Sequence, residues 1–481
     1  MRIDLILRYV GLVMLFIAAF MLLSAVISLA SGMDSSFYPL LLSALLTALL
    51  GAFPQIFVEK QSQLTGKEGF AVVVGSWLVA CVVGMFPYLV WGGDFNLVNA
   101  LFESVSGFTT TGATIIGDIE ALPRGLLFWR FSTCWIGGMG VVMFALAILP
   151  AIGRSKMMLA NVEMSTLAKE NYRYRTQMIV QILSVVYVGI TLLSTLLLKA
   201  AGMNWFDALC HAMSGVSTCG FSTKSLSLAF YNSPILEAVL IATMITAGVH
   251  FGLIYATVTG KRGNLFRSEV ARVYLCVIAV ASVLIAISLF AAELYPTFGQ
   301  SFRHALFQVS SLITTTGFAT ADTNTWTSFA MLILVFVSLV CACSGSTTGG
   351  IKMDRLVLAY KMLKARMKQQ RHPNAVIRIK LDGTIQESDM LHTVMVFIVA
   401  YLMLLLVGSL LGTLFGLDMT TAFTSAVACV GNVGPGFGEV GSMDNYAAMP
   451  VVMKYVDALL MLFGRLEIFG LIQLFFMKWW K

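Results

Sequence analysis

The stretch Ser106-Gly-Phe-Thr-Thr-Thr-Gly-Ala-Thr114 lies between two apolar segments that are each long enough to cross a bilayer. Its glycines and threonines are unsuited to a helix that faces lipid. Three related stretches follow at 214–222, 311–319 and 428–436, spaced by about a hundred residues. Their aligned glycines are Gly112, Gly220, Gly317 and Gly434. An internal period of this length indicates a domain-sized duplication rather than a solenoid repeat.

The repeat extends upstream of these glycines. An alanine stands twelve residues before each one, and apolar residues stand eleven and four residues before it. These spacings predict that the three positions share one face of a helix. From first to third position the residues are Ala100, Ala208, Ala305 and Ala422, then Leu101, Leu209, Leu306 and Phe423, then Phe108, Val216, Ile313 and Val430.

The composition is that of an integral membrane protein. Of 481 residues, 58% are hydrophobic and 11% charged, whereas soluble domains have about a quarter charged. The eight cysteines lie in apolar segments or in the repeat, and Cys341-x-Cys343 has no second pair at zinc spacing, which predicts neither a metal site nor a disulfide framework. The five histidines are scattered, so the sequence does not indicate an enzyme.

Apolar runs predict an all-α protein with ten membrane spans and four re-entrant loops. Two spans, at 9–30 and 38–58, form an N-terminal hairpin. Each following unit has a span, a segment too short to cross about 30 Å of hydrocarbon, the Thr/Gly stretch and a second span. The units are expected at 70–91, 97–114 and 126–152; at 178–198, 205–222 and 235–258; at 270–292, 302–319 and 329–343; and at 392–415, 419–436 and 449–479. The expected domains are therefore 1–67, 68–175, 176–268, 269–380 and 381–481.

Positive charge is concentrated in alternating loops. Most lysines and arginines fall in the N-terminus to Arg8, in 60–67, 154–175, 261–272 and 352–380, and at Lys478 and Lys481. This pattern follows the positive-inside rule, so both termini are expected in the cytoplasm. The net charge of +7 therefore reflects membrane topology and does not indicate a nucleic-acid partner.

The Thr/Gly stretches have the chemistry of an ion filter. Non-helical backbone is tolerated at membrane depth where it lines a water-filled cavity, and rings of carbonyls can replace the hydration shell of an ion. A short helix ending at each stretch would direct its negative end toward a cation. Because the four stretches contain no Asp or Glu, they favour a monovalent cation. Four acids near the expected outer mouth either concentrate cations there or are ordinary solvated loop charges; they are Asp118, Glu120, Asp322 and Glu439.

Two further features lie directly after one expected span and inside another. Ser344-Gly-Ser-Thr-Thr-Gly-Gly350 cannot continue a helix through lipid, which indicates either a flexible gate or an ordinary helix end before a basic loop. Arg465 lies in the last span, where an arginine is costly and hence a candidate functional residue. A structural pair with Glu467 is the alternative, although residues two apart do not share a helix face.

Taken together, these motifs resemble the Trk/Ktr/HKT superfamily of potassium transporters. The resemblance is carried by the four glycine-anchored loops and by the runs 135–140, 345–350 and 464–469. The extra N-terminal hairpin makes the chain most similar to the bacterial TrkH-type subunit. The family's filter glycine in the first loop is Gly112 here, which implies potassium rather than sodium. The fourth loop, 432–435, departs most from Thr-x-Gly. The implied potassium ligands are Thr110, Thr111, Gly112, Thr218, Cys219, Gly220, Thr315, Thr316, Gly317, Asn432, Val433 and Gly434.

The resemblance also implies how flux is controlled. It implies channel-like potassium uptake across the bacterial inner membrane, with ion-coupled transport, by protons or sodium, as the alternative. Arg465 is expected to act as an electrostatic barrier beneath the filter, and homodimers with a cytoplasmic ring of TrkA-like nucleotide-binding subunits are expected. This chain has no Walker loop, so ATP or NAD would bind to that partner. The implied gate residues are Gly345, Ser346, Thr347, Thr348, Gly349 and Gly350.

Overall fold

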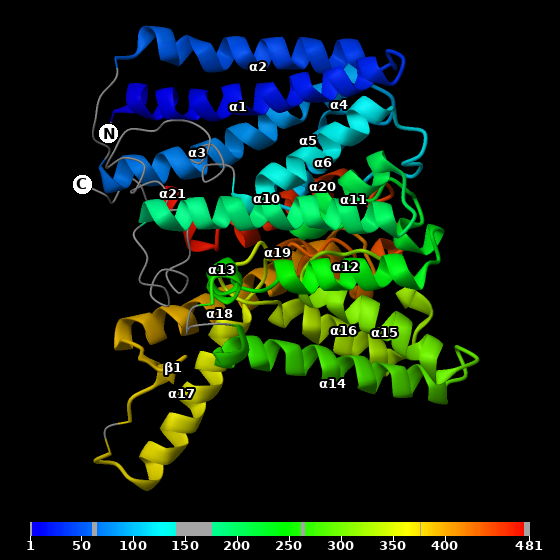
Figure 1. The fold of residues 1–481 in the computed structure, drawn as a ribbon. Helices are drawn as coiled ribbons and strands as arrows, with labels where there is room; N and C mark the ends of the chain where they lie inside the picture. Colours follow the sequence, from blue (N-terminus) through cyan, green and yellow to red (C-terminus); the bar gives the residue numbers. More distant parts are fainter. Residues whose placement is uncertain (1, 60–64, 141–175, 261–264, 376, 476–481) are drawn as a thin grey trace.

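The computed structural model describes residues 2–59, 65–140, 176–260, 265–375 and 377–475. In this part of the chain nearly all regular structure is helical (Figure 1). One antiparallel hairpin pairs β1 (Lys380–Leu381) with β2 (Thr384–Ile385). The long helices run side by side, and α1 begins at the end of the bundle where α21 lies (Figure 1). The expected basic loop at 154–175 and most of that at 60–67 lie outside the described residues.

The N-terminal hairpin consists of α1 (Ile3–Ala30) and α2 (Phe37–Phe57). The two helices touch closely, because a Cβ added to Gly11 would lie 2.7 Å from the carbonyl oxygen of Gly51. Small residues permit this approach where lipid provides no hydrophobic drive for helices to associate. Helix α1 then packs against α3 and α6 of the first repeat unit, so the hairpin borders the repeats from one side (Figure 1).

Four units follow, each with a long helix, a short helix and an interrupted second helix. The first has α3 (Gly66–Gly84), α4 (Phe86–Trp91), α5 (Leu97–Phe108) and α6 (Arg124–Met139); the second has α10 (Thr176–Ala200), α11 (Trp205–Ser217), α12 (Pro234–Ala247) and α13 (Phe251–Val258); the third has α14 (Glu269–Ala291), α15 (Phe298–Ile313), α16 (Ser328–Val340) and α17 (Met353–Arg371); the fourth has α18 (Ser388–Leu414), α19 (Met419–Gly431), α20 (Val451–Arg465) and α21 (Phe469–Phe475). Short 3-10 turns lie at Ser227–Phe230, Leu265–Arg267, Thr323–Thr325 and Gly438–Val440.

The short helices α5, α11, α15 and α19 share their start and their buried face. Each begins at a residue whose side-chain oxygen accepts a backbone N–H of the first turn, which is a strong N-cap; these are Asn96, Asn204, Thr297 and Asp418. The repeated alanines are at most 1% exposed, and the third-position residues are fully buried. The middle position differs from expectation: Phe423 is 39% exposed, because a residue one step from the alanine lies about 100° around the helix.

In the first, second and fourth units the second helix is interrupted where the sequence predicts a continuous span, whereas in the third unit α16 ends close to the predicted break at 344–350. Six helices of the described residues are long and apolar enough to cross a membrane, or seven if α12 and α13 form one span bent by 104°. Helix α6 ends at a glycine-rich run, α16 ends at Cys341, and α20 ends before two residues with positive φ, Glu467 and Ile468. Glycine and left-handed residues break the helical hydrogen-bond ladder. The number of membrane crossings remains a prediction.

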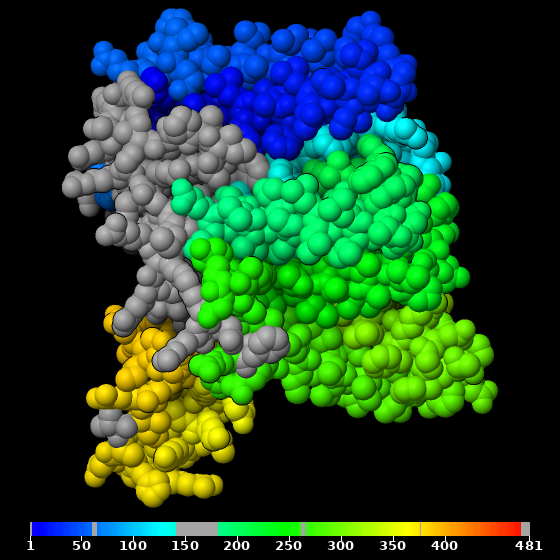
Figure 2. Space-filling model, in the orientation of Figure 1, coloured from blue at the N-terminus to red at the C-terminus, as the bar shows by residue number. Residues whose placement is uncertain are grey.

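The segment expected as a basic loop at 352–380 is largely ordered. Residues Met353–Arg371 form α17, because lysine, arginine, leucine and methionine are good helix formers. The helix leaves the packed body, and the space-filling view shows this region projecting below it (Figure 2). Lys361 of α17 pairs with Glu269 at the start of α14, which ties the projecting segment to the third unit.

Candidate ion filter and gate

The four short helices end in the same backbone turn. The residue two before each aligned glycine has a left-handed φ of +53° to +56°, and the glycine itself has a φ of +81° to +95°. Left-handed φ is uncommon outside glycine, so four repeats of this pair are a structural signature. The N–H of the intervening residue returns to a helix carbonyl five residues earlier, over 2.8–3.0 Å, from Thr111 to Ser106, Cys219 to Ser214, Thr316 to Ser311 and Val433 to Ala428.

The four turns close into a ring. A Cβ added to Gly112 would lie 1.8 Å from the carbonyl oxygen of Cys219 in the next loop. The same relation links Gly220 to Thr316 at 1.9 Å and Gly317 to Val433 at 2.3 Å. Gly434 closes the cycle, because its Cβ would lie 2.5 Å from the Thr111 carbonyl oxygen. Each position therefore requires glycine for two reasons: its φ is positive, and the carbonyl oxygen of the next loop leaves no room for a Cβ.

This ring brings the four predicted tripeptides together, at 110–112, 218–220, 315–317 and 432–434. Apart from the glycines, their residues are at most 1% exposed, and none carries a charge. Helix C-terminal ends meet at the ring, and each carries a partial negative charge. Backbone carbonyls and helix ends in this arrangement suit a dehydrated monovalent cation.

The fourth loop differs in sequence, and Asn432 gives the difference a physical role. Its side-chain Nδ2 donates to Thr111 Oγ1 at 3.0 Å and to the Met461 carbonyl at 2.9 Å. These bonds join loop four to loop one and to α20. A threonine here would lack the second donor, so the departure from Thr-x-Gly adds a cross-link at the point where the ring closes.

A buried ion pair supports loops one and two, a role that was not predicted from the sequence. Arg130 Nε lies 2.6 Å from Glu103 Oε1, and the two side chains are at most 1% exposed. Glu103 accepts the Ile115 N–H at 3.1 Å, and Arg130 donates to the Ser222 carbonyl at 3.3 Å. Removing one partner would leave an uncompensated buried charge. Two opposite charges in apolar segments were the signal that could have revealed the pair.

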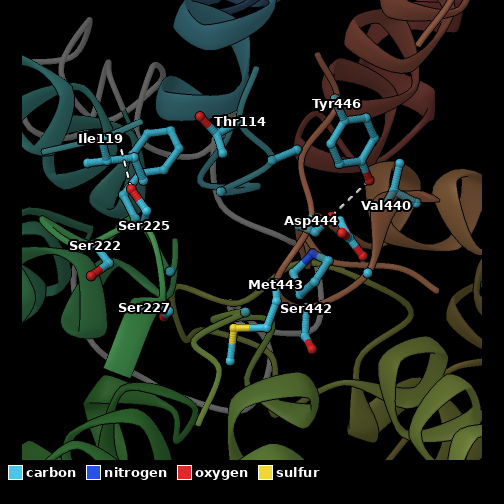
Figure 3. A pocket seen from close by; sticks show the side chains of 18 of the residues that line it. Thr114, Ile119, Ser222, Ser225, Ser227, Val440, Ser442, Met443, Asp444 and Tyr446 are labelled. Atoms are coloured by element: carbon cyan, nitrogen blue, oxygen red, sulfur yellow. Dashed lines mark hydrogen bonds between the residues drawn. The ribbon is translucent and has the colours of Figure 1, made fainter. Parts of the chain in front are cut away.

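Tyr446 connects loops one and four, and this role was also not predicted from the sequence. Its hydroxyl donates to the Gly434 carbonyl at 2.8 Å, and its N–H donates to the Thr114 carbonyl at 2.8 Å (Figure 3). Tyr446 lies in an irregular segment twelve residues beyond Gly434. No sequence pattern marks it, because both of its partners are backbone groups brought near by the fold.

The predicted gate segment lies against the ring. Residues 341–352 connect α16 to α17 without helical structure, and most are buried. The Thr347 hydroxyl donates to the Val216 carbonyl at 3.0 Å, and the Gly349 N–H donates to the Thr315 hydroxyl at 3.0 Å. An ordinary helix end would lead straight to solvent, so a buried connection that contacts units two and three favours the gate interpretation.

Arg465 ends α20 and bridges two other units. Its guanidinium donates to the carbonyls of Thr347 at 2.8 Å and Gly138 at 2.9 Å, and also to that of Gly137. The first belongs to the gate segment and the others to α6. The alternative partner, Glu467, forms an ion pair with Arg355 of α17 at 2.8 Å. The hydrogen bonds of Arg465 therefore hold the gate segment to the first unit.

A cavity lies on the other side of the ring, and all four aligned glycines line it. Residues after loop four, including Met443 and Asp444, face Ser222 and Ser225 after loop two (Figure 3). We call this cavity the mouth.

The mouth contains charges that differ from those expected. Lys224, Arg130 and Asp444 line it. Burial, with a smaller contribution from nearby Asp322, raises the pKa of Asp444. Among the four predicted acids, Asp118 and Asp322 accept backbone N–H groups of their own turns, and Glu120 pairs with Lys224. The four predicted acids do not line the mouth.

Comparison with known proteins identifies the family. Residues 41–479 match the TrkH family, described as a cation transport protein. The chain is 34% identical to the Trk system potassium uptake protein TrkH of Halomonas elongata over the full length of both, and 33% identical to that of Escherichia coli K12 over 98% of both. The crystal structure of the potassium transporter TrkH from Vibrio parahaemolyticus superposes with a TM-score of 0.88 at 29% identity, covering 98% of each chain. The chain therefore belongs to the TrkH family of cation transport proteins.

Proposed function

We propose that this chain takes up potassium ions through the ring of four loops. The observation that carries the proposal is the closed cycle of glycines, in which each filter glycine seats against a carbonyl of the next loop. The names of the relatives, which are potassium uptake proteins, support potassium as the cargo. The repeat units that contribute the loops are proposed to be 68–175, 176–268, 269–380 and 381–481, with 1–67 as a separate hairpin.

In this proposal the filter carbonyls replace the water around the ion. The left-handed pairs in each loop let successive carbonyls point to one side, and the helix ends add partial negative charge. The absence of acids from the four loops favours an ion of single charge. The ligands are supplied by Thr110, Thr111, Gly112, Thr218, Cys219, Gly220, Thr315, Thr316, Gly317, Asn432, Val433 and Gly434.

The segment Gly345–Gly350 is proposed to close the pathway below the ring. Arg465 is proposed to hold this segment closed by hydrogen bonds and to repel cations by its charge. Opening would break the hydrogen bonds from Arg465 to Thr347 and from Gly349 to Thr315. Gly345 and Gly350 have φ of +74° and +68°, a conformation that glycine adopts without steric cost. A positive charge beneath the filter opposes cation exit until it moves.

Control of the gate is proposed to come from outside the chain. The relatives are named as parts of a Trk system, which supports a separate subunit. We propose that this subunit is cytoplasmic and binds ATP or NAD. Helix α17 leads directly from the gate segment to the protein surface, where such a subunit would act on it. We also propose an inner-membrane homodimer, as the resemblance to the Trk/Ktr/HKT superfamily implies. Both termini are proposed to be cytoplasmic, because the basic loops favour that orientation.

Electrical recording from the purified chain in liposomes tests this function. We expect currents that reverse at the potassium Nernst potential and do not shift with a proton or sodium gradient. A reversal potential that follows the pH gradient would show that transport is coupled to protons and is not channel-like. Protein that is present in the membrane but carries neither potassium current nor potassium flux, with and without the regulatory subunit, would contradict the proposal.

A further inference from the structure

A lysine stands at the mouth of this cation pathway. Lys224 lines the cavity that contains the four filter glycines. It lies four residues after Gly220, and its backbone N–H donates to the Ser222 hydroxyl at 3.1 Å. A fixed positive charge repels every cation, so its place in a cation pathway requires a physical reason.

Two neighbouring side chains fix the ammonium group of Lys224. Lys224 Nζ lies 3.3 Å from Glu120 Oε1 and 4.3 Å from the centre of the Phe230 ring. The Lys224 side chain is 24% exposed and that of Glu120 is 44% exposed. Glu120 does not line the mouth, so an ion in the mouth experiences the ammonium more strongly than its counter-charge.

The other charges that line the mouth belong to an internal ion pair or come from another unit. Arg130 is neutralised by Glu103 at 2.6 Å. Asp444 comes from the fourth unit, and its carboxylate accepts from Asn324 Nδ2 at 3.1 Å. The mouth therefore carries one positive charge from unit two and one negative charge from unit four, both close to uncharged filter carbonyls.

We propose that Lys224 disfavours divalent cations in the mouth more strongly than it disfavours potassium. The proposal rests on the proposed function, because it concerns entry to the same filter. A positive potential reduces ion occupancy by a Boltzmann factor whose exponent is proportional to the ion's charge. If the potential of Lys224 lowers potassium occupancy by a given factor, it lowers magnesium or calcium occupancy by the square of that factor. Divalent ions are therefore depleted relative to potassium before they reach the neutral carbonyl ring.

The square relation predicts the size of each effect. A unit charge about 8 Å away in water changes the occupancy of a monovalent ion by about two- to threefold. Lys224→Gln should therefore lower the half-saturating potassium concentration by about two- to threefold. It should lower the half-blocking magnesium concentration by about four- to ninefold. Glu120→Gln should shift both values in the opposite direction, because it leaves the ammonium without its counter-charge.

The experiment is single-channel or macroscopic recording of the full chain in liposomes, with magnesium chloride added on the mouth side at fixed ionic strength. Lys224→Arg keeps the charge and should behave as the wild type. Lys199→Gln is the matched control, because Lys199 also lies over an aromatic ring, 5.6 Å from Trp205, but does not line the mouth. Tighter block in Lys224→Gln cannot arise from misfolding, since misfolded protein carries no current.

The outcomes separate this inference from the proposed function. Unequal shifts that follow the square relation, with opposite signs for Lys224→Gln and Glu120→Gln, support it. Equal shifts for potassium and magnesium, no shift at all, or the same shift in Lys199→Gln would overturn it while potassium currents persist. Absence of potassium current from the wild type would instead overturn the proposed function.

Discussion

Replacing Gly112 with serine tests the filter at its tightest contact. The added Cβ would lie 1.8 Å from the Cys219 carbonyl oxygen, whereas ordinary contact begins at 3.4 Å, so that oxygen must retreat by about 1.6 Å. Serine at the φ of +81° that Gly112 adopts also costs about 1–2 kcal/mol. The substitution therefore displaces a carbonyl of loop two as well as straining loop one.

The expected loss follows from the value of one displaced ligand. A polar contact to a charged group contributes about 1.5–3 kcal/mol, and about 1.4 kcal/mol is a factor of ten in relative affinity. We therefore expect Gly112→Ser to lower the preference for potassium over sodium by about tenfold or more. Sodium should then carry measurable current.

The assay is the reversal potential with potassium on one side of a liposome membrane and sodium on the other. Gly117→Ser is the matched control, because a Cβ added to Gly117 meets nothing within 4 Å. It should retain the selectivity of the wild type. If Gly112→Ser inserts normally and keeps full potassium selectivity, loop one does not form part of the filter.

Three other substitutions probe the gate, the filter support and the mouth. Arg465→Ala removes hydrogen bonds to Thr347 and α6 and should raise potassium flux several-fold; unchanged or lower flux at equal expression would contradict the barrier. Tyr446→Phe removes one bond of about 1 kcal/mol to the Gly434 carbonyl, so potassium-to-sodium selectivity should fall about fivefold, and unaltered reversal potentials would argue against this support. Burial and Asp322 raise the pKa of Asp444, so lowering the pH on the mouth side should neutralise it earlier than an ordinary aspartate and raise the half-saturating potassium concentration. Asp444→Asn should abolish that pH dependence. If Asp444→Asn and the wild type have the same pH profile, Asp444 is not the group that titrates at the mouth.

The ring was predictable because its requirements fall on residue types that the sequence displays. A left-handed φ and close approach of a neighbouring carbonyl both select glycine, so Gly112, Gly220, Gly317 and Gly434 recur in register. The alanine twelve residues earlier recurs for a related reason, since the short helices pack tightly there. Local backbone requirements of this kind leave a direct record in the sequence.

Contacts between residues far apart in the chain could not be predicted from the sequence. Tyr446 binds two backbone carbonyls, and no partner residue type could reveal it. Proximity along the chain to the loops suggested Asp118 and Glu120 as mouth acids, but the cavity is lined by Asp444 from a different unit. The interruptions of the second helices in units two and four were not predicted, because apolar composition continues across the breaks at His250 and Glu467.

Locating the bound ion tests the assignment of the four loops as the filter most directly. Rubidium replaces potassium and scatters X-rays anomalously, so crystals of the full chain grown in rubidium chloride can be compared with crystals grown in sodium chloride. We expect anomalous density on the axis enclosed by Gly112, Gly220, Gly317 and Gly434, present with rubidium and weaker in Gly112→Ser. Rubidium density elsewhere in the bundle, with none inside this ring, would contradict the assignment of the four loops as the filter.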